Sequence, residues 1–278
     1  MQKILFVTNA SFLNASAMGF AAYIAKQNHG KLVGVFLENL KYKPYPEVKR
    51  VLGFPYVEEI TAQSVQSPET VQEIENNVDL FRNYCVQQDI ACIIHRDQGT
   101  PVELAIEESR YADLIITDAA TSFSYHEESV PTRFVKEILM EAECPVIVAP
   151  ERFEEVNEVV LCYDGSKSSV FAIKLFTYLC PSFANKDITL LHIQENENDH
   201  VDARDKVMEW LRIHYTSVSL QLLFGDAGEQ LFKTFLGRSD KLLVMGAMGR
   251  SGISSLFKQS TAELLLEAVD TPVFIAHA

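Results

Sequence analysis

Short runs of apolar residues alternate with longer amphipathic stretches along the whole chain. In the first half these runs occupy residues 4–7, 32–37, 90–95, 114–117 and 146–149. They are apolar throughout, which is typical of strands with both sheet faces covered by helices. The stretches between them have helical periodicity. Strands that alternate with helices predict right-handed crossovers and a parallel α/β sheet.

The same pattern occurs twice, in the same order. Residues 3–9, 31–37, 98–103 and 143–149 correspond to residues 158–164, 187–193, 224–229 and 270–276. Each copy therefore predicts one doubly wound, five-stranded parallel sheet. We expect two domains, at residues 1–150 and 156–278, joined by a short linker that begins at Pro150.

The first copy is longer than the second. Asn9 and Asp164 are 155 residues apart, whereas Gly99 and Gly225 are 126 apart, so the first copy carries about 29 extra residues. Three prolines and one glycine interrupt the extra stretch at residues 38–66. We interpret it as an insertion or long loop inside the first domain.

Capping residues mark several helix ends. Ser67, followed by a proline, predicts the start of a helix over residues 70–88. Residues 100–103 form a capping-box sequence, and Asp226 stands at the equivalent place in the second copy. Gly30 is expected to end the first helix.

Composition and charge exclude several classes of protein. The 24 basic and 38 acidic residues give a net charge of −14, which opposes binding to nucleic acid or anionic lipid. No apolar run approaches the roughly 20 residues needed to cross a bilayer, and the N-terminus lacks the features of a signal peptide. The five cysteines contain no Cys-x-x-Cys pair, so we expect buried thiols in a cytoplasmic protein.

A glycine-rich loop follows the fourth strand of the second copy. Gly246, Gly249 and Gly252 lie within seven residues, and Ser260 and Thr261 open the last helix. Glycines let a backbone approach an anion, and the N–H groups at a helix N-terminus favour its charge. From the pattern alone, the loop is either a phosphate-binding loop or a plain tight turn.

These residues resemble the universal stress protein family, with two family domains in tandem. The family signature is Gly, two residues, Gly, nine residues, Gly, then Ser or Thr. Gly246, Gly249 and Ser260 match it, whereas Gln259 replaces the third glycine. Gln259 either disturbs the loop or serves through its backbone N–H group. The resemblance implies a Rossmann-like fold of the adenine nucleotide alpha hydrolase-like type.

Two further positions match the family. Asp164 stands where the family places an aspartate at the end of its first strand. It is expected to act as a magnesium ligand or phosphoacceptor, to accept a hydrogen bond from the ribose or base, or, most simply, to cap the following helix. Ile193 ends a strand whose last residue, in the family, meets adenine through its backbone. The neighbouring His192 is interpreted as a satisfied, partly buried residue rather than a ligand.

The first copy departs from the signature. Asn9 replaces the aspartate, and no glycine occurs between Thr117 and Pro131. Asp118, Glu127 and Glu128 would oppose a triphosphate. We therefore predict no nucleotide in the first domain.

The last strand of each copy lies at a sheet edge in this strand order, and exposed apolar edges are normally paired or covered. Family members dimerise through this strand. The resemblance therefore implies an intrachain pseudo-dimer in which residues 146–149 and 273–276 pair. A further homodimer is left open.

The combined features predict a stress-response regulatory protein that binds ATP or a related adenine nucleotide, with or without Mg²⁺, in the second domain. Hydrolysis would be slow or absent, because no general base or Walker lysine is evident, and no catalytic residue is assigned. His95, His126 and His214 have no ligands at recognisable metal spacing, so no metal site is expected. The alternatives are a nucleotide-free adaptor or chaperone-like module and an adenylyltransferase or hydrolase of the wider fold group. A protein partner is expected but not identified.

Overall fold

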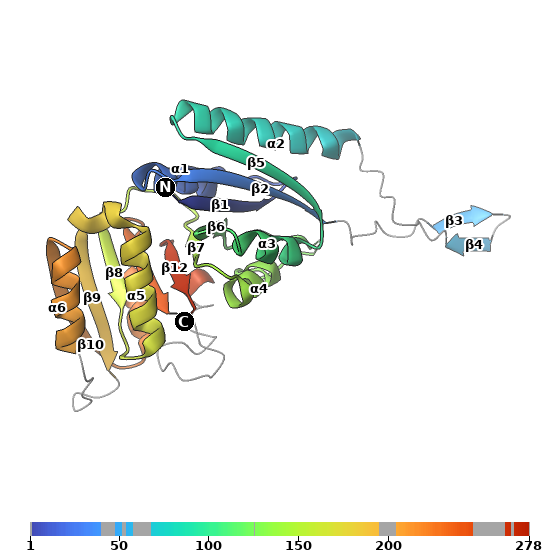
Figure 1. The fold of residues 1–278 in the computed structure, drawn as a ribbon. Helices are drawn as coiled ribbons and strands as arrows, with labels where there is room; N and C mark the ends of the chain where they lie inside the picture. The colour runs from blue at the N-terminus through green and yellow to red at the C-terminus, as the bar shows by residue number, and fades with distance from the viewer. Residues whose placement is uncertain are drawn as a thin grey trace.

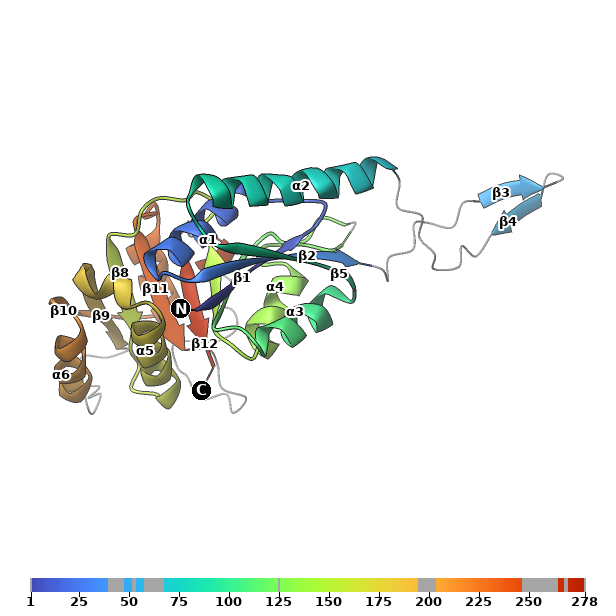
Figure 2. The ribbon, with the colours of Figure 1, turned by 45° about the horizontal axis from the view of Figure 1, so that its top comes forward.

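The protein contains one ten-stranded sheet with helices on both faces (Figures 1 and 2). The computed structural model describes residues 2–39, 48–51, 54–57, 68–124, 126–194, 204–246, 265–267 and 270–277. The strand order is β10-β9-β8-β11-β12-β7-β6-β1-β2-β5.

The first half supplies five parallel strands, in the order β5-β2-β1-β6-β7. The strands are β1 (Lys3–Asn9), β2 (Lys31–Asn39), β5 (Cys92–Gly99), β6 (Leu114–Asp118) and β7 (Val146–Ala149). The helices are α1 (Ala15–Gln27), α2 (Pro68–Gln87), α3 (Pro101–Ser109) and α4 (Arg133–Glu141). Residues of α1 and α2 pack on one sheet face, and residues of α3 and α4 pack on the other.

The second half repeats this topology, in the order β10-β9-β8-β11-β12. Its strands are β8 (Glu158–Cys162), β9 (Asp187–Gln194), β10 (Ser217–Phe224), β11 (Lys241–Gly246) and β12 (Val273–Ala276). Among the described residues its helices include α5 (Lys167–Leu179), α6 (Arg204–His214), α7 (Ala227–Phe235) and the short 3-10 helix η1 (Pro181–Asn185), and residues 265–267 are also helical. The prediction of a duplicated parallel α/β fold is therefore confirmed.

The two halves meet at β7 and β12, which pair antiparallel with Ile147 opposite Phe274. The expected pairing of these two edges is confirmed. The sequence predicted two separate sheets. Pairing of β7 with β12 instead joins the two halves into one continuous sheet. Both apolar clusters also cross the junction, since each contains side chains from both halves.

The two outermost strands differ from the apolar, doubly covered strands that the sequence predicted. β5 and β10 are largely half-buried or exposed, whereas β1, β2, β6 and β7 are mostly buried. β5 also begins at Cys92 rather than at Ile90. Ile90 lies in the turn that follows α2, where its N–H group donates to the carbonyl of Cys85 at 2.9 Å and Asp89 adopts a left-handed φ of 56°.

The predicted insertion contains a small hairpin. β2 continues through Asn39, so the first residues of the 38–66 segment belong to the main sheet. β3 (Val48–Val51) and β4 (Phe54–Val57) form a separate antiparallel two-stranded sheet (Figure 1). The other residues of the segment lie outside the described part of the chain.

Two of the predicted helix caps can be compared with the structure. Asp226 caps α7, because its carboxylate accepts from the N–H group of Glu229 at 2.9 Å. Thr100 is the N-cap residue of α3 and Glu103 lies in its first turn, so the predicted helix start is confirmed, but the Thr100 side chain makes no cap hydrogen bond. Pro101 at the first helical position lacks the N–H group that would otherwise need a partner.

Gly30 follows the first helix, as expected, but for a different physical reason. The left-handed residue after α1 is His29, with φ 51°. The N–H group of Gly30 donates to the carbonyl of Ala25 at 2.8 Å. A Cβ atom on Gly30 would lie 2.9 Å from Ile4 Cδ1, so a larger residue would require the end of the Ile4 side chain to shift.

Arg96 joins three elements of the first half and is expected to contribute strongly to stability. Its guanidinium pairs with Glu38, which is buried at the end of β2, and with Glu75 of α2 at 2.6 Å. The hydrogen bond to Glu38 is the main cause of a raised pKa for this guanidinium. Removing Arg96 would take the guanidinium away from the buried Glu38 carboxylate, whereas Gln98, whose Nε2 atom donates to it at 2.9 Å, carries no compensating charge.

We therefore expect Arg96→Leu to lower the free energy of unfolding by about 2–3 kcal/mol, somewhat less than for a fully buried pair. Chemical denaturation measures this change. The matched control is Arg82→Leu, which removes the pair with Asp79 in which both side chains are more than half exposed. It should cost no more than about 0.5 kcal/mol. Equal losses in the two variants would contradict the role of Arg96.

Candidate functional site

The carboxyl ends of β8 and β11 lie side by side in the middle of the second half. Leu161 of β8 pairs with Val244 of β11, and the chain leaves β8 toward β9 on the opposite side. Strand order therefore reverses between β8 and β11. In open parallel sheets, ligands bind outside the carboxyl ends of the strands at this position.

Asp164 stands at this edge, in the turn that connects β8 to α5. Its Oδ1 atom accepts from the N–H group of Ser166 at 2.9 Å, across Gly165, which has a left-handed φ of 80°. Ser166 then caps α5 by accepting from the N–H group of Ser169 at 3.1 Å. Asp164 is half-buried and supports the start of the helix, in agreement with the simplest of the roles predicted for it.

Gly246 is the last residue of β11, and the first turn of α5 packs directly against it. A Cβ atom at this position would lie 2.5 Å from the backbone carbonyl carbon of Ser168 and 2.6 Å from its oxygen. This close approach explains why the position has no side chain. The glycine therefore has a structural role that is independent of any ligand.

Ile193 lies near the end of β9, beside the end of β8. The N–H group of Tyr163 donates to the carbonyl of Leu191 at 2.9 Å, which fixes the side to which the backbone of Leu191 points. Because backbone groups of residues two apart in a strand point to the same side, the N–H and C=O of Ile193 face the end of β8. Asp164, Ile193 and Gly246 are thus brought to one edge of the sheet.

His192 points to the other side of β9 from the core around Ile193. It is buried, and its Nδ1 atom lies 2.7 Å from the carbonyl oxygen of Tyr163, so Nδ1 carries the proton. Its Nε2 atom is buried without a hydrogen-bond partner in the described part of the chain. The prediction of a buried histidine is therefore confirmed, but only one of its two nitrogens is satisfied.

The rest of the predicted site lies outside the described residues. This applies to Gly249, Gln259, Ser260 and Thr261, whose assignment remains a prediction from the sequence.

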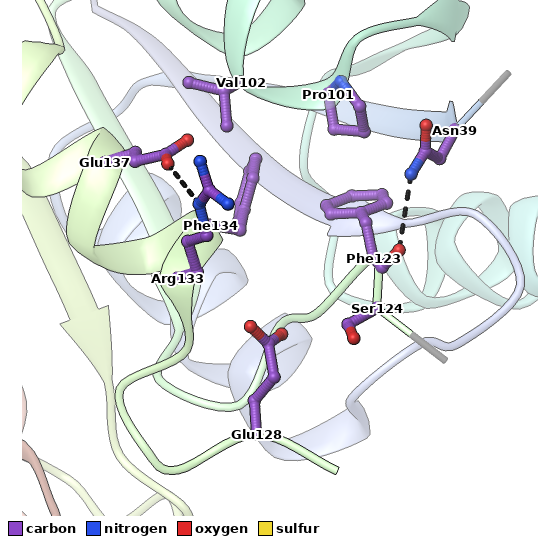
Figure 3. A pocket seen from close by; sticks show the side chains of 9 residues that line it. All are labelled: Asn39, Pro101, Val102, Phe123, Ser124, Glu128, Arg133, Phe134 and Glu137. Carbon is purple, nitrogen blue, oxygen red and sulfur yellow. Dashed lines mark hydrogen bonds and ion pairs between the residues drawn. The ribbon is translucent and has the colours of Figure 1, made fainter. Parts of the chain in front are cut away.

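The equivalent position in the first half is occupied by the protein's own loop. Asn9, the counterpart of Asp164, donates through Nδ2 to the carbonyl of Ser122 at 2.8 Å. Asn39 at the end of β2 donates to the carbonyl of Phe123 at 3.3 Å (Figure 3). These two amides hold the segment that follows β6 against the ends of β1 and β2.

The loop leaves a cavity of about 330 Å³ that is aromatic inside and acidic at its rim. Phe123 and Phe134 meet edge to face with ring centroids 4.8 Å apart. Glu128 and Glu137 also line the cavity, and Arg133 is paired with Glu137 at 2.6 Å (Figure 3). Carboxylates at the rim disfavour a polyphosphate.

The five cysteines are free thiols. Cys85, Cys162 and Cys180 are buried as expected, whereas Cys92 and Cys144 are only partly buried. Burial raises the pKa of Cys180 to about 12, and burial followed by the charge of Asp113 raises that of Cys144 to about 12. Both groups are therefore protonated near neutral pH and are poor nucleophiles.

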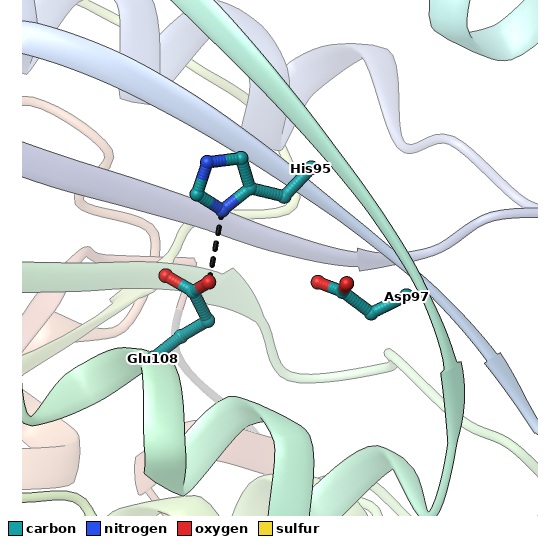
Figure 4. Close-up of side chains that lie close together, drawn as sticks. All are labelled: His95, Asp97 and Glu108. Atoms are coloured by element: carbon teal, nitrogen blue, oxygen red, sulfur yellow. Dashed lines mark hydrogen bonds and ion pairs between the residues drawn. The ribbon is translucent and has the colours of Figure 1, made fainter.

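The structure also brings together a group that the sequence analysis missed. His95 and Asp97 of β5 lie beside Glu108 of α3, with one potential ligand atom from each within 4.8 Å of the others (Figure 4). A signal was present, since two residues separated by one position share a face of a strand. Glu108 could not be added without knowing how α3 packs.

Comparison with known proteins agrees with this fold. No family model matches the chain. The universal stress protein Slr1230 from Synechocystis sp. (strain ATCC 27184 / PCC 6803 / Kazusa) is 22% identical over 290 residues, covering 98% of this chain and 99% of the relative. The crystal structure of a universal stress protein from Archaeoglobus fulgidus DSM 4304 superposes with a TM-score of 0.69 at 15% identity, covering 99% of this chain and 98% of the other.

The fold and the strand-end site define a class of protein with two parallel α/β halves joined through their last strands. The sequence match runs over nearly the full length of both proteins. The predicted resemblance to tandem universal stress proteins is therefore confirmed. None of the helices in the described part of the chain has the length and apolar character that crossing a bilayer requires.

Proposed function

We propose that this chain is a regulatory protein of the stress response that binds ATP or a related adenine nucleotide in its second half. The observation that carries the proposal is the convergence of Asp164, Ile193 and Gly246 where strand order reverses between β8 and β11. A carboxylate, backbone groups at a strand end and a glycine at the start of a loop suit the ribose, base and phosphates of a nucleotide.

The sequence after β11 supports a phosphate-binding role for the loop. Gly249 permits close backbone approach, and Ser260 and Thr261 add hydroxyl groups at the predicted start of the last helix. The protein carries a net charge of −14, so binding would rely on these local donors, and Mg²⁺ would offset part of the phosphate charge. Gln259 would contribute through its backbone N–H group.

A single nucleotide per chain is proposed. In the first half, Asn9 and Asn39 hold the loop after β6 over the equivalent strand ends, and Glu128 and Glu137 line the remaining cavity. The neutral amide of Asn9 also lacks the charge of Asp164. This arrangement favours a structural role for the first half.

The proposed role of the nucleotide is regulatory and not catalytic, with hydrolysis slow or absent. The glycine-rich loop leads along the chain to β12, and β12 pairs with β7 of the first half. Occupancy of the loop would therefore act on the segment that joins the two halves. An unidentified protein partner in the cytoplasm would respond to this change.

A nucleotide-free adaptor or chaperone-like module is the second candidate. Two observations favour it: Gly246 is explained by its packing against Ser168, and the carboxylate of Asp164 supports the start of α5. Both residues would be retained without a ligand. Gln259 in place of the third glycine agrees with this alternative.

Calorimetry with ATP, AMP and adenosine, together with mass spectrometry of any nucleotide that copurifies, distinguishes the two candidates. The expected result is one site per chain, weakened at least tenfold in Gly249→Val and retained or tightened in Gln259→Gly. Gly19→Ala is the control, because Gly19 lies in α1 of the first half and an added Cβ atom there would meet no atom closer than 3.4 Å. Absence of binding in both the natural protein and Gln259→Gly would favour the adaptor.

A further inference from the structure

The outer edge of the first half carries a compact group of three metal-binding side chains. His95 and Asp97 share one face of β5, and Glu108 reaches them from α3 (Figure 4). One ligand atom from each residue lies within 4.8 Å of the other two. All three side chains are partly buried, so the group is accessible to a small ion from solvent.

We propose that His95, Asp97 and Glu108 bind a divalent transition-metal ion of the zinc class. The Nδ1 atom of His95 lies 2.9 Å from Oε1 of Glu108. Two ligands bonded to one zinc ion at about 2.0–2.1 Å are roughly 2.9–3.4 Å apart, so this pair has the required spacing. Asp97, with a carboxylate oxygen within 4.8 Å of a ligand atom of each of the other two residues, would supply the third protein ligand, and water would fill the remaining positions. Imidazole with two carboxylates is a ligand set that zinc and its neighbours accept.

The ammonium group of Lys3 would compete with a metal ion for the carboxylate of Glu108. This group lies 3.1 Å from Oε2 of Glu108, the oxygen that does not face His95. The ammonium neutralises part of the charge that would attract a cation, and bound metal would repel it. A metal site and a plain ion-pair network therefore predict different results when Lys3 is removed.

Metal binding would add to the His95–Glu108 contact that already links β5 and α3. β5 is the outermost strand of the first half, and α3 covers one of its faces. A ligand that binds only the folded protein raises its thermal stability as its concentration rises. Zinc should therefore increase the melting temperature of the full-length, tag-free protein.

The experiment uses protein stripped with a chelator and titrated with Zn²⁺ by calorimetry and with Co²⁺ by visible absorption. The natural protein should bind with a saturable site that includes nitrogen and oxygen ligands. His95→Ala and Glu108→Gln should weaken that site at least tenfold, and Lys3→Gln should tighten it several-fold. The matched controls are His126→Ala and Glu107→Gln, which remove an exposed histidine and the exposed neighbour of Glu108 on the same helix.

Circular dichroism of every variant verifies that the fold is retained. The proposal is overturned if the natural protein shows no saturable binding. It is also overturned if the controls weaken binding as much as His95→Ala, or if Lys3→Gln leaves or lowers the affinity. Asp97→Asn tests the contribution of the third proposed ligand to metal binding, and it leaves the ion pair between Lys3 and Glu108 in place.

Discussion

Phe274→Lys should destroy the packing that holds the two halves together. Phe274 is fully buried in β12, opposite Ile147 of β7, and its ring meets Phe176 edge to face at 5.3 Å. The substitution removes a large apolar side chain and buries a charge. Either change alone costs several kcal/mol, so the loss of unfolding free energy should exceed about 4 kcal/mol. Chemical denaturation, scattering and limited proteolysis of the linker measure the result.

Two controls separate the charge from its location. Phe274→Leu keeps an apolar side chain and should cost about 1–2 kcal/mol. Leu220→Lys places the same charge on the outer strand β10, where Leu220 is 41% exposed, and should change stability by no more than about 0.5 kcal/mol. If Phe274→Lys kept the compact shape, the protease resistance and the stability of the natural protein, the junction would not hold the halves together.

Gly246→Ala should lower the unfolding free energy by about 2–3 kcal/mol, independently of any ligand. The new methyl group would lie 2.5 Å from a backbone atom of Ser168, and a backbone cannot rotate away as a side chain can. Either α5 or the end of β11 must move. Denaturant unfolding without nucleotide measures the effect. Gly249→Val is accordingly the better variant for testing ligand binding, because loss of binding in a Gly246 variant would not distinguish ligand contact from misfolding.

The matched control for this prediction is Gly19→Ala. Gly19 is also buried, but the nearest atoms to its added Cβ are Tyr84 Oη at 3.4 Å and Phe153 Cδ1 at 3.7 Å, which are ordinary contacts. Because Gly19 lies inside α1, alanine should stabilise the helix by about 0.5–1 kcal/mol. A Gly246→Ala protein as stable as the natural one would contradict the close approach of α5.

The fold could be predicted because its determinants are local and repeated. The apolar run of residues 4–7 and its counterpart in β8 define buried central strands without knowledge of their neighbours. The pairing of β7 with β12 followed from the resemblance to a family that pairs through this strand. By contrast, the start of β5 was misplaced because Ile90 is apolar, yet its N–H group completes the end of α2.

The site was predictable only where residues follow strand ends. Asp164, Ile193 and Gly246 could be assigned to one edge because strand topology brings strand ends together. The contact between Gly246 and Ser168 depends on how closely a helix approaches a strand, which no sequence pattern encodes. The same limit applies to two other contacts. Glu108 reaches His95 because of how α3 packs, and Asn9 donates a hydrogen bond to Ser122, which lies 113 residues later in the chain.

The antiparallel junction between β7 and β12 lies within a single polypeptide, and this changes what dilution and mutation can do. Two separate subunits would dissociate at low concentration, whereas covalently connected halves meet at a fixed effective concentration. A substitution in a symmetric homodimer appears in both subunits, but here it appears in one half alone. Asn9 and its loop could thus diverge from Asp164 and its loop without disturbing the opposite copy.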